Sequence, residues 1–447
     1  MFAMYALISF LAIGVGLLDI AQAVTCNLTP SYAAPVLANG WKAQLVATGL
    51  SDPRSVTFDR NGNLLVVQQG VGVVHLDFED GGSTCLRVSK KTNLITASTL
   101  NHGIALSKDG NTLYASSSDA VYSWSYDPDA VSVGTSNHTL VTGMSNSDHT
   151  TRTLLLSQRE PGWLLVSRGS QSNIDLEAES IESGHSQIKA FNISNLTSAS
   201  PAYGFTTTGR LLGWGLRNSV GVAEEPLTGG IYSVENSADE IKRNGVDIHQ
   251  NNPGEELNFH GFLNSSTGDQ GGNYGYPYCF AVWDISIPSG EGLKTGDQFT
   301  LEQNITIDDT FCRRERVPPR LTFHANMAPL DIKFLPNGTE AYVSFHGSWD
   351  RSDPVGYKLS SIAFASGSPV AAADSMTAAV DIMTNPDNSK CPDGCFRPVG
   401  LALDDKGRIF MSSDATGEIW VVERTANATG TGTTTGTGTA ATPSASG

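Results

Sequence analysis

The stretch 53-PRSVTFDRNGNLLVVQQ-69 joins two short apolar runs through an Asn-Gly turn. Short apolar runs on both sides of such a turn are typical of a β-hairpin. A single hairpin cannot bury both of its faces, so it needs partners of the same kind. The hairpin therefore raises the question of whether the chain repeats it.

The same pattern, a polar or cationic residue followed by two apolar runs around a turn, recurs five more times. The further copies are 101-NHGIALSKDGNTLYASSS-118, 149-HTTRTLLLSQREPGWLLVSRGS-170, 217-RNSVGVAEEPLTGGIYSVEN-236, 328-APLDIKFLPNGTEAYVSFHGSW-349 and 397-RPVGLALDDKGRIFMSSD-414. The first three copies begin 48 residues apart, at 53, 101 and 149, which is about one propeller blade. The starts at 217, 328 and 397 leave room for long loops, above all in 237–327.

Six hairpins of one kind can bury each other when they belong to sheets arranged radially around an axis. We therefore predict an all-β fold, a six-bladed β-propeller over residues 24–424. We expect the ring to close by pairing the earliest and latest strands of this region. The composition agrees, because 46 glycines and only 16% charged residues among 447 favour short strands and tight turns.

The two ends of the chain differ from this pattern. Residues 1–23 form an apolar segment that ends in Ala-Gln-Ala, which predicts a signal peptide cleaved after Ala23. No Lys or Arg precedes the segment and Asp19 interrupts it, so a membrane anchor is the alternative. Residues 425–447 contain Thr, Gly and Ser and no apolar side chain larger than Ala, which predicts a disordered tail.

Six cysteines and several glycosylation sequons indicate an exported protein. Proximity in sequence suggests Cys391 with Cys395, Cys279 with Cys312, and Cys26 with Cys85, among about fifteen possible pairings. A metal or redox pair is the alternative for Cys391 and Cys395. The sequon asparagines are Asn137, Asn192, Asn195, Asn264, Asn304, Asn337 and Asn427. We expect a secreted, extracellular glycoprotein that is monomeric.

The net charge restricts the partners. Lys and Arg number 28 against 45 Asp and Glu, which gives −17. A chain this acidic is a poor match for a nucleic-acid backbone or an anionic membrane, so we expect neither as a partner.

Scarce cationic side chains stand at equivalent places in the repeats. In a propeller the loops that enter the first strand of each blade meet around the axis. The residues at these places are Arg54, His102, His149 with Arg152, Arg217 with Asn218, and Arg397. Guanidinium groups bind carboxylates in bidentate geometry, so this ring predicts a polyanionic ligand. Alternatively, the side chains satisfy carbonyls at strand starts or pair with acidic loops.

Two other segments carry polar clusters. The stretch 232-YSVENSADEI-241 is rich in oxygen ligands, which suits calcium, although a solvated acidic loop is equally compatible. The stretch 345-FHGSWDRSDPVGYK-358 places His346 and Arg351 close together. The sequence contains no serine nucleophile elbow, Walker loop, HExxH or Rossmann fingerprint, which disfavours nucleotide-based redox chemistry.

At these motifs the chain resembles a known family. GLRNSVG around Arg217, DHTTRTLLLS around His149, LVSRGSQSN, NYGYPYC, HGSWDRSDPVGYK and FRPVGLALDDKG occur in this order. In this order they resemble the soluble glucose/sorbosone dehydrogenases that depend on pyrroloquinoline quinone (PQQ), and in particular the secreted fungal pyranose dehydrogenases. The motifs span all six repeats.

The resemblance implies a reaction and roles for two residues. It implies that a pyranose or 2-keto-aldose is oxidised at C1 by hydride transfer to PQQ. His149 matches the family's general base, which takes the proton of the C1 hydroxyl. Arg217 matches the arginine that stabilises negative charge on the quinone oxygen. An external acceptor, such as a cytochrome or a quinone, would receive the electrons.

The resemblance also implies binding residues. PQQ would lie over the channel, with its carboxylates met by the ring defined above. Calcium would polarise the quinone carbonyl and be held partly by main-chain carbonyls near Val234 and Glu235. The family has Gly-Pro in this loop and this chain does not. A cofactor-binding lysine and one of two paired arginines also lack clear counterparts, and Arg351 and Arg397 are the substitutes.

Two other functions fit the same fold. One is a calcium-dependent propeller hydrolase of the lactonase kind, which uses a metal and a histidine base without an organic cofactor. It would need several carboxylate or Asn side chains in the funnel, where this sequence places mainly Arg and His. The other is a non-catalytic propeller that binds carbohydrate or protein.

Overall fold

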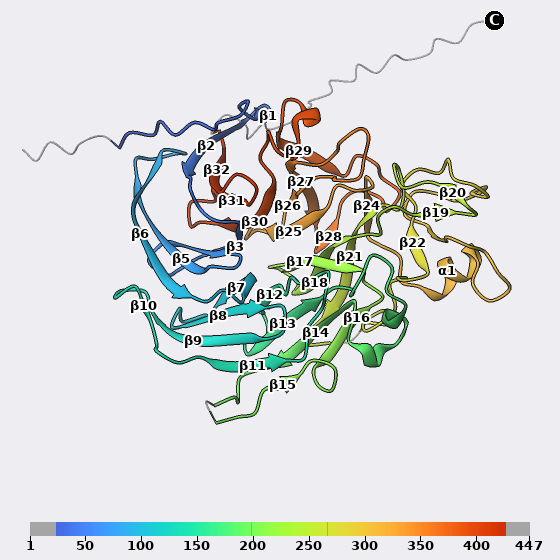
Figure 1. Cartoon of the computed structure of the whole chain (residues 1–447), viewed down its shortest axis with the longest axis horizontal. Coiled ribbons are helices and arrows are strands. Elements are labelled where there is room, and N and C mark those ends of the chain that lie inside the picture. Colours follow the sequence, from blue (N-terminus) through green and yellow to red (C-terminus); the bar gives the residue numbers. More distant parts are fainter. Residues whose placement is uncertain (1–23, 198, 266, 426–447) are drawn as a thin grey trace, which may run out of the picture.

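The chain forms a closed ring of six β-sheets around a central axis (Figure 1). The computed structural model describes residues 24–197, 199–265 and 267–425. The predicted all-β six-bladed propeller is confirmed. The predicted signal peptide 1–23 and all of the tail 425–447 except Thr425 lie outside the described residues.

Each blade is built from four main strands. Blade one contains β3 (Pro53–Phe58), β4 (Leu64–Gln68), β5 (Gly72–Asp80) and β6 (Leu86–Thr96). Blade two contains β7 (Leu100–Leu106), β8 (Thr112–Ser117), β9 (Val121–Asp127) and β11 (His138–Thr142), with β10 (Ser132–Val133) and β15 (Tyr203–Gly204) added at its outer side. Blade three contains β12 (Leu154–Leu156), β13 (Trp163–Arg168), β14 (Gln187–Asn192) and β16 (Arg210–Trp214).

The second half of the ring follows the same order. Blade four contains β17 (Asn218–Glu224), β18 (Gly230–Asn236), β21 (Glu255–Phe262) and β24 (Leu321–Phe323). Blade five contains β25 (Pro329–Phe334), β26 (Glu340–Phe345), β27 (Lys358–Ala365) and β29 (Ala379–Thr384), with β28 (Ser368–Pro369) and β1 (Val36–Leu37) added. Blade six contains β30 (Pro398–Leu403), β31 (Ile409–Ser413), β32 (Glu418–Arg424) and β2 (Trp41–Ala47).

The ring is closed by a strand from the start of the chain. β2 pairs antiparallel with β32, from Trp41 opposite Arg424 to Ala47 opposite Ile419. The outermost strand of blade six therefore comes from the opposite end of the sequence, as predicted. Because this pairing joins the two ends of the ring, it leaves no open edge between the first and last blades.

The six repeats form the two innermost strands of the six blades, which confirms the predicted hairpins. The segment 237–327 is more ordered than the long loop we expected. It supplies β21 and β24 to blade four. It also forms β19 (Lys242–Arg243) with β20 (Val246–Asp247), β22 (Cys279–Ala281) with β23 (Gln298–Thr300), and α1 (Asp309–Glu315), at one side of the ring (Figure 1).

The apolar alternation of the inner strands builds the core. In β4, Leu64 and Val66 pack in a cluster with blade six, whereas Leu65 and Val67 pack in a cluster with blade two. Successive side chains of a strand point to opposite faces, so one apolar run serves two interfaces. A cluster of this kind lies between every pair of neighbouring blades.

Small residues let neighbouring blades approach closely near the axis. A Cβ on Gly103 would lie 2.2 Å from the carbonyl oxygen of Arg152, and one on Gly400 would lie 2.5 Å from that of Arg54. The hydroxyl of Ser412 donates to the Arg54 carbonyl oxygen at 2.6 Å. Glycine is required at both positions because the backbone of the next blade occupies the space that a side chain would need.

The three predicted disulfides are confirmed. Cys26–Cys85, Cys279–Cys312 and Cys391–Cys395 are all formed. The sequon asparagines at 137, 192, 195, 264, 304 and 337 are all exposed, and Asn427 lies outside the described residues. Among the described residues, no helix has the length and apolar character needed to cross a membrane.

Candidate active site

His149 stands just before β12, at the mouth of the channel. Its Nδ1 lies 2.9 Å from Ser170 Oγ and 3.1 Å from the Ser170 carbonyl oxygen. A carbonyl oxygen only accepts, so Nδ1 carries the imidazole proton. Ser170 Oγ donates its own proton to the Ser172 carbonyl oxygen at 2.8 Å, which frees a lone pair for His149. The other ring nitrogen, Nε2, therefore has a free lone pair.

His149 Nε2 has no hydrogen-bond partner in the described part of the chain. It is also not one of the buried polar atoms that lack a partner, so it is accessible. Burial, together with the positive charge of Arg217, lowers the pKa of His149 to about 4. The imidazole is therefore neutral at ordinary pH. An accessible, unprotonated Nε2 is the arrangement that a general base needs.

Arg217 lies just before β17, and its side chain is almost fully buried. Its Nη2 donates to Asn173 Oδ1 and to Asp239 Oδ2, both at 2.8 Å. Nε donates to the Asn173 carbonyl oxygen at 3.1 Å. The guanidinium group is thus held by partners from two loops and keeps a fixed orientation.

One loop positions both residues. Ser170 contacts His149, and Asn173, three positions later, contacts Arg217. Asn218 joins the group through Gly169, where a Cβ would lie 2.4 Å from Asn218 Oδ1 and 2.8 Å from His149 Cβ. The structure therefore brings together the predicted residues His149, Arg217 and Asn218.

Arg152 lies close to His149 in sequence but contacts only backbone around it. Its side chain is fully buried. Nη1 donates to the carbonyl oxygens of His149 at 2.8 Å and Thr151 at 2.5 Å, and Nη2 donates to that of Met144. We expected either contact with a cofactor or support of the neighbouring site residues, and both Nη groups are engaged by the carbonyl oxygens of this loop. Arg152 is placed to position His149.

A second cluster gathers side chains from blades one, two, five and six. Arg54 Nη1 lies 2.5 Å from Asp414 Oδ2, and His346 Nε2 lies 2.9 Å from Asp414 Oδ1. Arg54 Nε donates to His102 Nδ1 at 3.4 Å, so His102 is the neutral partner. Although burial acts to raise it, the pKa of Asp414 is held well below its usual range by His346 and Arg54. Two predicted residues, Arg54 and His346, therefore share one unpredicted carboxylate, and His102 joins the cluster through Arg54.

Arg397 and Arg351 differ from the other arginines of the mouth. Arg397 donates to the carbonyl oxygens of His346 and Gly347, both at 3.3 Å, and Arg351 donates to the Asp353 carbonyl oxygen at 2.9 Å. Among the described residues, neither forms an ion pair with a carboxylate. Both are half-buried, so each keeps a cationic group that an anionic ligand could reach.

Val234 and Glu235 do not lie where we predicted. Both are buried inside β18 rather than in the loop that follows it, which begins at Ser237. Glu235 Oε1 accepts from the Arg217 backbone N–H at 2.5 Å, and Oε2 accepts from Asn258 Nδ2 at 3.0 Å. Both oxygens of the Glu235 carboxylate accept hydrogen bonds within the sheet. β18 can therefore continue through Glu235, which we had placed in a loop. Burial raises the pKa of Glu235 well above its usual value, as does neighbouring Glu256.

Comparison with known proteins decides the family. The model of a family described as TrAA12-like matches residues 35–425, which is nearly all of the described chain. The chain belongs to the TrAA12-like family. This match and the relatives below confirm the resemblance predicted from the motifs.

Two relatives of this TrAA12-like chain have named activities. A "pyrroloquinoline quinone-dependent sugar dehydrogenase" of Hypocrea jecorina (strain QM6a) is 51% identical over 407 residues, which are 90% of this chain and 92% of the relative. A "pyrroloquinoline quinone-dependent pyranose dehydrogenase" of Coprinopsis cinerea is 39% identical over 411 residues. That match covers 88% of this chain and 55% of the Coprinopsis protein, so this chain spans about half of that relative's length.

A solved structure of the same family superposes closely. It is described as the calcium structure of Trichoderma reesei Carbohydrate-Active Enzymes Family AA12. The TM-score is 0.87 at 52% sequence identity, and the match covers 89% of this chain and 99% of the other.

The mouth of this TrAA12-like propeller fits an anionic ligand and a cation. Arg397 and Arg351 supply cationic groups without a carboxylate partner among the described residues. Asp350 lies in the loop that follows β26, and both of its side-chain oxygens are buried without a hydrogen-bond partner in the described part of the chain. Burial raises the pKa of Asp350; burial and the charge of Asp350 raise that of Asp239, although Arg217 acts to lower it. A buried carboxylate without a partner, beside one that Arg217 engages through a single oxygen, is suited to bind a cation.

Some residues of this site were not predicted from sequence. Ser170 and Asn173 lie inside the quoted motif LVSRGSQSN, and Asp414 ends the sixth repeat. All three follow the second strand of a hairpin. In an antiparallel hairpin the end of the second strand lies beside the start of the first, so the same repeat alignment could have found them.

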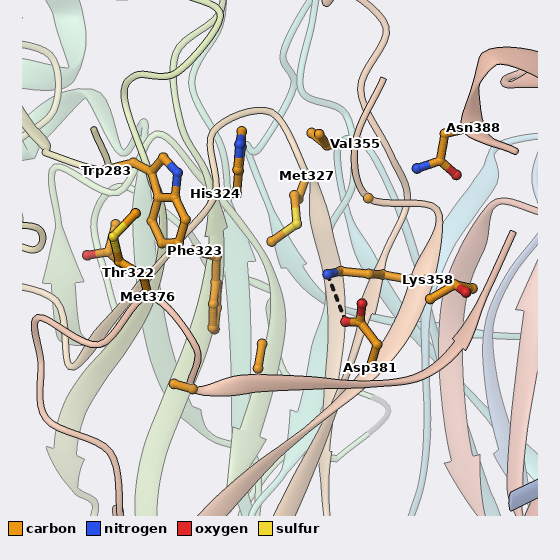
Figure 2. A pocket seen from close by; sticks show the side chains of 14 residues that line it. Trp283, Thr322, Phe323, His324, Met327, Val355, Lys358, Met376, Asp381 and Asn388 are labelled. Carbon is orange, nitrogen blue, oxygen red and sulfur yellow. Dashed lines mark ion pairs between the residues drawn. The ribbon is translucent and has the colours of Figure 1, made fainter. Parts of the chain in front are cut away.

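A separate cavity of about 310 Å³ lies between blades four and five, next to β24 and β27. Figure 2 shows Trp283 and His324 on one side of it and the Lys358–Asp381 ion pair, 2.8 Å long, on the other. None of the predicted site residues lines it. Gly356 lines it and packs closely against the backbone of Gly347.

Proposed function

We propose that this chain is a PQQ-dependent sugar dehydrogenase that oxidises a pyranose or 2-keto-aldose at C1. The names of the two relatives support the cofactor and the substrate class. The observation that carries the proposal is the state of His149: Nδ1 is protonated and engaged by Ser170, and Nε2 is open at the mouth of the channel.

His149 would accept the proton of the C1 hydroxyl at Nε2. The positive charge that develops on the ring is stabilised by the polar contacts of Nδ1–H with Ser170, which strengthen when the donor is charged. The loss of this proton allows C1 to release its hydrogen as hydride. When bound, PQQ supplies the quinone that accepts the hydride and its two electrons.

Arg217 would stabilise the negative charge that develops opposite His149. Asn173 and Asp239 hold the guanidinium group in advance, so little reorganisation is needed during the reaction. The low pKa of His149 agrees with this arrangement, because burial and the nearby positive charge of Arg217 keep the base unprotonated.

The residues that would hold PQQ are those with cationic or polar groups at the mouth. Arg397 and Arg351 are the first candidates, because neither is engaged by a carboxylate among the described residues. The other candidates are Arg54, His102, His346 and Asn218, and Arg152 would act by positioning His149. Calcium would be held by oxygens beyond β18, with Asp239 and Asp350 in place of the predicted Val234 and Glu235, whose carbonyls belong to a strand.

We also propose that the enzyme is secreted and glycosylated. Three disulfides and six exposed sequon asparagines support this. The electrons would pass to an external acceptor such as a cytochrome or a quinone.

The test is to load tag-free protein with PQQ and Ca²⁺ and to measure PQQ binding and the quinone absorbance after adding aldopyranoses. We expect PQQ to bind and to be reduced by substrate. The His149→Ala variant should keep PQQ binding and lose turnover. The matched control is His138→Ala. The Nε2 of His138 contacts the Ser200 carbonyl oxygen on the outer side of blade two, so this substitution should leave turnover unchanged.

Three outcomes would overturn the proposal. The first is failure of PQQ to bind in the presence of Ca²⁺. The second is hydrolysis of lactones by the calcium-loaded protein without PQQ, which would indicate a hydrolase. The third is binding of sugar to the PQQ-loaded protein without any reduction, which would indicate a non-catalytic binding propeller.

A further inference from the structure

Asp175, Glu177 and His185 form a cluster of metal-ligand side chains behind the loop that positions His149 and Arg217. Their ligand atoms all lie within 4.8 Å of one another. Asp175 caps the 3-10 helix η1 (Leu176–Glu179), and His185 follows the 3-10 helix η2 (Ile181–Ser183). Asp175 and His185 are buried, whereas the Glu177 carboxylate faces solvent.

The contact between His185 and Asp175 is not an ordinary hydrogen bond. His185 is 5% exposed, and its Nδ1 lies 2.8 Å from Asp175 Oδ2. Nevertheless Nδ1 is a buried nitrogen without a hydrogen-bond partner in the described part of the chain, because the angles at this contact are not those of a hydrogen bond. The two atoms are close, but the ring does not aim a proton at the carboxylate.

Two ligands of one metal ion also lie close together without pointing at each other. Ligand bonds of about 2.0–2.2 Å place two ligands of one metal ion about 3 Å apart without alignment between them. Glu177 Oε2 lies 3.9 Å from His185 Nδ1. Because the Glu177 side chain is exposed, it is free to swing in and complete a set of three ligands.

We infer that Asp175, Glu177 and His185 bind a divalent transition-metal ion of the zinc type. A nitrogen ligand with two carboxylates suits Zn²⁺ and its first-row neighbours, whereas Ca²⁺ takes oxygen ligands only. The two carboxylates match the charge of the ion. In the described part of the chain, the guanidinium group of Arg168 donates to the Ser183 carbonyl oxygen at 3.2 Å and to Asn146 Oδ1 at 3.1 Å rather than to the carboxylates of the cluster.

The ion would stabilise the loop that carries the site. Asp175 Oδ2 accepts from the Gln171 backbone N–H at 2.8 Å, and the Asp175 backbone nitrogen lies 2.5 Å from the hydroxyl oxygen of Tyr276. Ser170 and Asn173 belong to the same loop. A metal bound to Asp175 therefore restrains the segment that orients His149 and Arg217. The metal site itself does not depend on the proposed function.

The test is isothermal titration of Zn²⁺ into tag-free, chelator-treated full-length protein, with millimolar Ca²⁺ present and PQQ and sugar absent. We expect one site that Ca²⁺ does not compete for, and a rise in melting temperature with Zn²⁺. His185→Ala should abolish binding. Glu177→Gln, an exposed and isosteric change that leaves the fold intact, should weaken binding at least tenfold. His138→Ala should bind like the wild type.

A second measurement reports on the ligands directly. Co²⁺ added in place of Zn²⁺ should give visible absorption bands that are lost in His185→Ala and altered in Glu177→Gln. Unchanged Zn²⁺ affinity in both variants, displacement of Zn²⁺ by Ca²⁺, or no binding at all would overturn the inference. Because no turnover is measured, a failure here leaves the proposed dehydrogenase function to its own test.

Discussion

Ser170 Oγ lies 2.9 Å from His149 Nδ1 and donates its own proton to the Ser172 carbonyl oxygen. The hydroxyl can therefore only accept from the imidazole, and the Ser170 carbonyl oxygen at 3.1 Å imposes the same direction. Two acceptors in one residue thus select the tautomer in which Nε2 is the free base.

Removing the Ser170 hydroxyl should slow the reaction without greatly affecting sugar binding. Ser170→Ala leaves the carbonyl contact but loses one hydrogen bond to the charged form of His149. A bond of this kind contributes about 1 kcal/mol, so we expect kcat to fall about fivefold to tenfold, with KM nearly unchanged. The control is Ser172→Ala, which removes a nearby hydroxyl but keeps the carbonyl that Ser170 contacts. Equal effects of both substitutions on kcat would contradict the assigned role.

The pH dependence of turnover should report the pKa of His149. Burial and the charge of Arg217 lower this pKa to about 4, and the base acts only when it is unprotonated. Near neutral pH the protonation of His149 should therefore not limit activity. Activity should fall as the pH drops through about 4. The measurement is kcat/KM between pH 3 and 8, and an acid limb near the usual histidine pKa of about 6.5 would argue against the site geometry.

Removing the charges of Arg217 and its partner Asp239 should shift the acid limb of the pH profile. The double substitution Arg217→Gln with Asp239→Asn removes both charges of this ion pair, and the single variant Asp239→Asn separates the loss of Arg217 from the loss of a proposed calcium ligand. We expect kcat to fall about 100-fold or more, as for the loss of a preorganised charge-stabilising group. The acid limb should shift to higher pH, because the positive charge that lowers the pKa of His149 is gone. A large loss of kcat with no shift of the limb would mean that Arg217 does not act on His149.

Buried carboxyl groups in blade four should make stability depend on pH. Burial raises the pKa of Glu256 to about 7, so between about pH 4.5 and pH 7 the folded chain keeps a proton that the unfolded chain releases. The contribution of this group to the free energy of unfolding should therefore decrease as the pH rises through this range, by at most about 1.4 kcal/mol per pH unit. Glu256→Gln should flatten the decrease.

Denaturant unfolding at pH 5, 6, 7 and 8 measures this effect. Glu79→Gln is the control, because Glu79 is an exposed residue that pairs with Arg87. Burial raises the pKa of Glu255 to about 8. The stability of the Glu256→Gln variant should therefore still depend on pH in part, through Glu255.

Buried histidines such as His149 and His260, whose pKa values burial lowers, act in the opposite direction but are the same in both proteins, so the difference between wild type and Glu256→Gln isolates the effect. A difference in unfolding free energy that stays constant from pH 5 to pH 7 would contradict the prediction.

Much of the fold was predictable because it depends on local patterns. The six hairpins follow from apolar alternation and turn residues within about twenty positions, and ring closure follows from their number. The segment 237–327 was harder, because β21 buries Glu255 and Glu256 where a simple pattern expects apolar residues. β21 can form there because neighbouring groups form hydrogen bonds with these two carboxyl groups.

The site was predictable by position but not by partner. The alignment of repeats placed His149, Arg217, Arg54 and His102 at the channel mouth. It did not distinguish Arg152, which is fully buried among backbone carbonyls, from Arg397, which is half-buried. Both are arginines at similar places in their repeats, and only the folded loops around them determine what each guanidinium group contacts.

The amino-acid sequence alone determined the number of blades, the hairpin at the centre of each one and the residues at their entrances, because these depend on alternation and turns along one stretch of chain. Only the tertiary structure determined that Asp414 meets Arg54, 360 positions earlier in the chain. It likewise determined that Ser170 selects the tautomer of His149 and that Asp175 meets His185 beneath the same loop. These contacts depend on how closed blades and loops bring atoms within about 3 Å, and no local pattern encodes that distance.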